Sequence, residues 1–271
     1  MKLDYGTLLC PDPIQLSIGT IRQPTLREIR NLSFEKFGAY ELFLKISPEE
    51  YYTKFLKADE KWDSFTLQEQ VEMTMFDVIL SDNSLRDTYL EIFSFFFEED
   101  IIFTDGLFVL LNDSYKDKSK EEKDELTQND VRGVITKENF KDALEVIQQV
   151  CHIYDGDKVD DEKNNKYKNK LAEKLLKRMK QGAREQEERS RKKGKGQNKN
   201  MQIENIISAV SNRHPTLSPL TIWDTTIFIL LDSFERLQVN EDYEMIKHQV
   251  CVWGDEKKNF KRDLWYQNNY N

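Results

Sequence analysis

The segment LTIWDTTIFILLDSFERL, residues 220–237, is strongly apolar although it lies near the end of a polar chain. Thr221 and Asp224 follow Pro219, a combination that predicts the start of a helix. At roughly 100° per residue, six large side chains of this helix fall within a stripe about 120° wide, which is the usual width of a core-facing surface. These residues are Trp223, Ile227, Leu230, Leu231, Phe234 and Leu237.

Three more apolar residues of the same helix, Ile222, Phe228 and Ile229, lie outside this stripe. The region 201–271 is near the size at which a separate core is only marginally stable. We therefore expect a further surface to cover the helix. The sequence leaves open whether that surface belongs to the preceding part of the chain or to a partner.

Aromatic residues also gather in the charged stretch that follows, at Trp253, Phe260, Trp265 and Tyr266. Large aromatic side chains with a polar edge are typical anchors of protein interfaces, and they serve equally well to pin a tail onto its own domain. We expect partner contacts at seven positions. They are Ile222, Phe228, Ile229, Trp253, Phe260, Trp265 and Tyr266.

Before this segment the chain changes composition, and residues 156–200 are dominated by charged side chains. We expect a solvated helix that leads into a flexible basic linker. The basic positions of this linker have no aromatic residue beside them on which a nucleic acid base would stack, which favours a hydrated connector over a nucleic acid site. They are Arg189, Arg191, Lys192, Lys193 and Lys195.

Residues 1–155 are predicted to form a helical domain with a small β-hairpin. Helix starts are marked by the capping-box pairs Thr25–Glu28, Ser47–Glu50 and Thr66–Glu69. We expect one continuous helix after Thr66, because apolar residues recur at helical spacing. This stripe consists of Leu67, Val71, Met75, Val78 and Ile79.

Two β-rich runs, DIIFTDGLFVLLND (100–113) and RGVITKENF (132–140), predict a short antiparallel pair joined by a long charged loop. Thr136 is the expected cap of the helix that follows. With the helical module predicted for residues 201–271, the fold class is mainly α.

The charge and the cysteines limit the function. The net charge of -9 argues against a protein whose whole surface binds nucleic acid. The start of the chain has no secretory signal, and no segment is long and apolar enough to span a bilayer, so we expect a soluble intracellular protein without membrane contact. The separated Cys10, Cys151 and Cys251 predict reduced and mostly buried thiols.

The sequence also lacks the motifs of common catalytic and cofactor sites, namely the phosphate-binding loop, the dinucleotide fingerprint and HExxH. His248 lies near Cys251, and Cys151 precedes His152, but neither pair has the second pair that a tetrahedral metal site needs. We expect no enzyme activity, no metal and no cofactor.

Four segments together resemble the tail assembly chaperones of long-tailed phages and prophages: PTLREI, GVITKENFKDALEVI, LTIWDTTIFILLDSFERLQ and VWGDEKKNFKRDLWYQNNY. The last two are the most specific. The resemblance implies a non-enzymatic, mainly helical protein that binds and solubilises the tape measure protein and recruits tail tube subunits. It also implies oligomers on the client, a location in the host bacterial cytoplasm and absence from the mature virion.

Two alternatives belong to other classes. A nucleic-acid-binding protein would act through the basic linker, with binding that weakens steeply as salt rises. A structural component of the virion or tail would remain in purified particles, from which a chaperone is absent.

Overall fold

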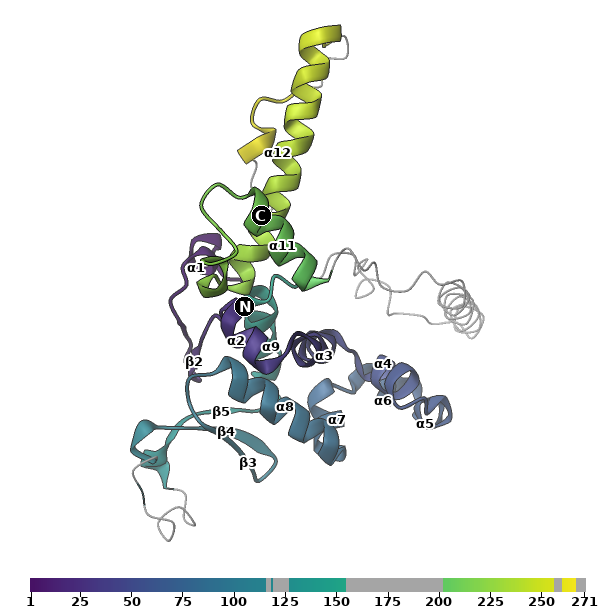
Figure 1. Ribbon diagram of the computed structural model, residues 1–271. Coiled ribbons are helices and arrows are strands. Elements are labelled where there is room, and N and C mark those ends of the chain that lie inside the picture. Colours follow the sequence, from purple (N-terminus) through teal and green to yellow (C-terminus); the bar gives the residue numbers. More distant parts are fainter. Residues whose placement is uncertain (116–117, 119–126, 155–201, 256–259, 267–271) are drawn as a thin grey trace.

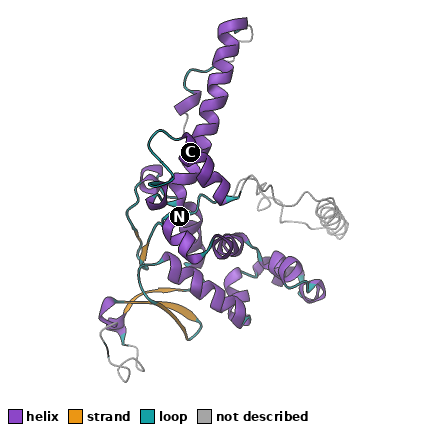
Figure 2. Cartoon of the chain, in the orientation of Figure 1, coloured by secondary structure: helices purple, strands orange, loops and turns teal. Residues whose placement is uncertain are grey.

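Capped helices form most of the chain before residue 100. The computed structural model describes residues 1–115, 118, 127–154, 202–255 and 260–266. The helices of this part are α1 (Tyr5–Leu9), α2 (Leu26–Leu32), α3 (Phe34–Lys45), α4 (Pro48–Glu50), the π-helix η1 (Tyr51–Phe55), α5 (Asp59–Ser64), α6 (Leu67–Glu72), α7 (Met75–Ser81) and α8 (Asn83–Phe96). Figure 2 shows that helices predominate and that strands are confined to one side of the molecule. The predicted mainly α class is confirmed.

The three expected capping boxes are present. At the first, the Thr25 backbone N–H donates to Glu28 Oε2 at 2.8 Å, while the Thr25 hydroxyl accepts from the Glu28 backbone N–H at 3.3 Å. Ser47 with Glu50 and Thr66 with Glu69 repeat the arrangement. Each box satisfies backbone donors that the first turn of a helix leaves unpaired.

The prediction of a single helix after Thr66 is wrong, because the chain forms α6 and α7 with a break between them. Thr74 begins a second capping box, in which its backbone N–H donates to Asp77 Oδ2 at 2.9 Å. This local capping competes with continuation of α6. The stripe is divided as a result: Leu67 and Val71 on α6 are exposed, whereas Met75, Val78 and Ile79 on α7 are buried.

A three-stranded antiparallel sheet replaces the expected pair. It consists of β3 (Ile101–Thr104), β4 (Leu107–Leu111) and β5 (Val131–Ile135), in that order. The first β-rich run folds on itself, because Asp105 and Gly106 both have positive φ, as a two-residue hairpin turn requires. A short separate ribbon pairs β1 (Ile14–Gln15) with β2 (Thr20–Ile21).

The helix after the sheet, α9 (Phe140–Val150), begins later than expected. Its N-cap is Asn139 rather than Thr136. From helical spacing we expect Phe140, Leu144, Ile147 and Cys151 to face inward; Phe140, Ile147 and Cys151 are buried, and Leu144 is half-buried. Burial raises the pKa of the Cys151 thiol, whereas Cys10 and Cys251 are exposed, so only one of the three thiols fits the expectation of burial.

After residue 201, the chain forms α11 (Ile203–Arg213), the 3-10 helix η7 (Ile222–Asp224), α12 (Ile227–Trp253) and the 3-10 helix η8 (Leu264–Tyr266). The predicted helix start at Thr221 and Asp224 is wrong, since that stretch forms η7. The long helix starts after Thr226, whose hydroxyl accepts from the Ile229 backbone N–H at 3.3 Å. Two further 3-10 turns, η2 (Asp113–Tyr115) and η4 (Gln128–Asp130), lie between β4 and β5 in the sequence.

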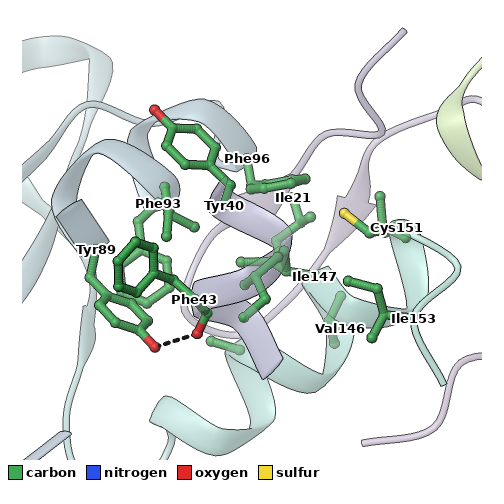
Figure 3. Packing of buried hydrophobic residues seen from close by; sticks show 14 of the residues in the cluster. Ile21, Tyr40, Phe43, Tyr89, Phe93, Phe96, Val146, Ile147, Cys151 and Ile153 are labelled. Carbon is green, nitrogen blue, oxygen red and sulfur yellow. Dashed lines mark hydrogen bonds between the residues drawn. The ribbon is translucent and has the colours of Figure 1, made fainter. Parts of the chain in front are cut away.

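The hydrophobic core starts among α3, α8 and α9 and continues into α11 and α12. Figure 3 shows its centre, where the Tyr89 hydroxyl donates to the Phe43 carbonyl at 2.7 Å. Ile206, Val210 and Leu230 belong to the same cluster. The segment after residue 201 therefore shares its core with the first part of the chain. In the described ranges, no helix has the length and apolar character needed to cross a membrane.

Candidate protein-interaction site

The base of α12 is held by the beginning of α2. The Leu26 backbone N–H donates to the Thr225 carbonyl at 2.9 Å, and the Ile227 N–H donates to the Pro24 carbonyl at 3.2 Å. Arg27 Nη2 lies 2.8 Å from Asp224 Oδ1. These links join segments almost 200 positions apart in sequence, and they fix the direction in which α12 leaves the molecule.

Side chains from α1, from the residue pair after α9 and from α12 also meet at this base. The Tyr5 hydroxyl donates to Asp232 Oδ1 at 2.9 Å, and Arg236 Nη2 donates to the Tyr5 oxygen at 3.4 Å. The His152 ring lies 5.2 Å from the Phe228 ring, and its Nδ1 is 3.8 Å from Glu235 Oε1. Burial raises the pKa of Tyr5 and lowers that of His152, although Glu235 opposes the second shift.

Other parts of the same chain cover the apolar segment 220–237. Ile222 and Phe228 are fully buried, and Ile229 is half-buried. The expectation that Ile222 and Phe228 contact a partner is therefore corrected, because the chain's own N-terminal part and α11 cover them. Sequence periodicity within α12 could not show this, since the covering residues are distant in sequence.

The distal half of α12 has a different environment. At 1.5 Å per residue, α12 is about 40 Å long, and Figure 1 shows that it projects beyond the other helices. We call the described residues from Gln238 to Tyr266 the arm. η8 returns along α12, and the Phe260 ring stacks on Tyr243 with centroids 5.6 Å apart. The arm is thus a helix with part of its own tail packed against one side.

Large apolar side chains remain exposed on the arm. Val252 is 69% exposed and Trp253 is 80% exposed, although both belong to a well-formed helix. Met245 and Ile246 lie one heptad before them and are exposed too. Contiguous exposed apolar surface on a folded protein marks a site of interaction with another apolar surface.

The predicted aromatic positions of the arm are brought together only in part. Trp265 and Tyr266 are exposed, with ring centroids 5.1 Å apart in an edge arrangement. Phe260 is half-buried against Tyr243. Trp253 is the most exposed of the four. The basic positions Arg189, Arg191, Lys192, Lys193 and Lys195 lie outside the described residues.

Sequence reasoning missed an apolar seam along the arm. Five residues alternate at spacings of four and three, which is the repeat by which one helix packs along another. Phe260 covers part of the seam at Tyr243, and its far end is open at Trp253. The seam consists of Val239, Tyr243, Ile246, Val250 and Trp253.

The described residues do not group three or more His, Cys, Asp or Glu side chains where they could hold a metal ion. His248 and Cys251, considered above as a metal pair, are both exposed on the arm. The anchored base of α12 and the apolar seam, which is exposed at Ile246 and Trp253, suit the binding of a protein.

Comparison with known proteins gives a match only in the part of the chain that includes the arm. Residues 193–270 match the family described as the YomV second domain, and this range includes α11, η7, α12 and η8. The match indicates a phage-derived protein. No curated protein and no solved structure matches the chain.

Proposed function

We propose that the chain is a non-enzymatic, phage-derived assembly chaperone that holds a helical client protein on its arm. The single observation that carries this proposal is the exposure of Val252 and Trp253 on a helix whose base is firmly anchored in the core. Tryptophan in particular contributes strongly to interfaces when a partner covers it.

The resemblance to tail assembly chaperones supplies the identity of the client. In that proposal the arm binds the tape measure protein, which is a long amphipathic helix that aggregates when its apolar face is uncovered. The spacing of the apolar seam supports such a client, since residues at this repeat pack along another helix. Recruitment of tail tube subunits and assembly of several copies on one client belong to the same proposal. So do a cytoplasmic location in the host and absence from the virion.

Co-expression with the tape measure protein of the same phage tests the proposal. The informative variant is Val252→Lys on the arm, and Val71→Lys on α6 is its matched control. Both valines are 69% exposed and both are the penultimate residue of a helix, where a cation is compatible with the helix dipole.

The measured quantity is the fraction of client that stays in the supernatant after centrifugation. We expect Val252→Lys to lower this fraction and Val71→Lys to leave it unchanged. Equal solubility of the client with both variants would overturn the proposal. Mass spectrometry of purified particles is a second readout, since a virion component would be found there and a chaperone would not.

A further inference from the structure

A cavity of about 620 Å³ opens between α3, α11 and the start of α12, away from the arm. Its apolar wall includes Phe37, Ile206 and Ile227, whose side chains are buried in the core. A smaller cavity of about 250 Å³ adjoins it, since Phe34 and Glu204 line both. The two form a groove that follows α11.

Gly38 keeps this cavity wide. It lies in the middle of α3 and lines the cavity, and a Cβ atom built there would meet nothing within 4 Å apart from its chain neighbours and the backbone of its own helix. Glycine inside a helix costs roughly 0.5–1 kcal/mol relative to alanine. Among the residues that the structure describes, no close packing requires glycine at this position. Its effect is to leave room in the groove.

Three carboxylates also line the cavity, those of Glu35, Glu41 and Glu204. Glu41 is half-buried, and burial raises the pKa of its carboxyl group, while Lys45 acts in the opposite direction. In the described ranges, none of the three makes a side-chain hydrogen bond or an ion pair of 4 Å or less. A cation in the cavity would therefore stabilise carboxylates that have no close partner among the described residues.

An apolar wall beside free carboxylates matches the long side chains of lysine and arginine, which have an aliphatic stem and a cationic head. We propose that the groove is a docking site for a helix of a protein partner, which inserts a lysine or arginine side chain beside Glu41. A helix rather than a small cation is favoured because the groove continues along α11 to Ile207 and Trp223, where apolar neighbours of the cation would lie. The proposal does not depend on client binding by the arm.

Fluorescence anisotropy with the full chain tests this docking site. The probe is a labelled synthetic amphipathic helix of leucine and lysine, and its companion has glutamate in place of lysine. Gly38→Leu fills the cavity, and Ala39→Leu is the matched control, because Ala39 is the next residue on α3, is exposed and does not line the cavity.

We expect Gly38→Leu to raise the Kd of the lysine peptide by about tenfold or more, and Glu41→Gln to raise it by about threefold to tenfold. Ala39→Leu should leave the Kd unchanged, and the glutamate peptide should not bind. Leucine has a higher helix propensity than glycine, so thermal unfolding should show Gly38→Leu to be at least as stable as the unaltered chain.

Three results would overturn the inference. They are an unchanged Kd in Gly38→Leu, an equal loss of affinity in Ala39→Leu, and absence of saturable binding of the lysine peptide by the unaltered chain.

Discussion

The Tyr5 hydroxyl donates a 2.9 Å hydrogen bond to Asp232 Oδ1, which joins α1 to α12. The Asp232 side chain is largely buried, and Arg236 Nε lies 3.8 Å from its carboxylate. The first and last parts of the described chain therefore fold as one core, and the arm projects from that shared base.

Tyr5→Phe removes this hydrogen bond and leaves a largely buried carboxylate with one donor fewer. We expect the free energy of unfolding to fall by about 1–2 kcal/mol. Urea denaturation followed by circular dichroism measures the loss, and Tyr266→Phe on the exposed end of the arm is the control. Identical unfolding midpoints for Tyr5→Phe and the unaltered chain would show that the bond contributes nothing to stability.

Phe228→Ala tests the burial of the apolar segment. The Phe228 side chain is inaccessible to solvent and contacts the rings of Tyr5 and His152. Truncating it should lower the free energy of unfolding by about 3–5 kcal/mol, through lost burial and the cavity that remains. Val252→Ala on the arm should change it by less than about 0.5 kcal/mol. A similar, small effect of both substitutions would place Phe228 outside the core.

His152 predicts a dependence of stability on pH. Burial lowers its pKa in the folded state below the ordinary value of about 6.5, so the unfolded chain binds the proton more readily. Stability should therefore fall as the pH decreases through about 6.5. His152→Asn removes the titration and suits the positive φ of this position.

Urea midpoints at pH 7.5 and 5.5 measure this effect. The decrease between the two values should be smaller in His152→Asn than in the unaltered chain. If both proteins lost the same stability, His152 would not be the group responsible.

Local signals allowed much of the fold to be predicted from the sequence. A capping box such as Thr25–Glu28 forms within four consecutive residues, so both of its partners can be recognised in one short stretch of sequence. The break at Thr74 shows the limit of apolar periodicity, because Leu67 and Val71 continue the stripe in sequence while the chain turns away from it. The Thr74–Asp77 capping pair inside this periodic stretch was the sequence signal from which the break could have been predicted.

The candidate site was less predictable, for a physical reason. Whether Phe228 is covered depends on Tyr5 and His152, and no pattern within the helix indicates residues so distant in sequence. Trp253 was among the expected partner contacts, because an aromatic residue among charges is conspicuous, and it is exposed in the structure. Ile246 one heptad earlier was missed, although its spacing from Trp253 was visible.

The central claim is that the arm is the surface that meets the client, and site-specific photocrosslinking tests it most directly. A photoreactive amino acid would replace Val252 on the arm or, as the control, the equally exposed Val71 on α6, during co-expression with the tape measure protein. The account predicts a covalent adduct with the client from position 252 and none from position 71. Equal adducts from both positions, or none from position 252, would contradict it.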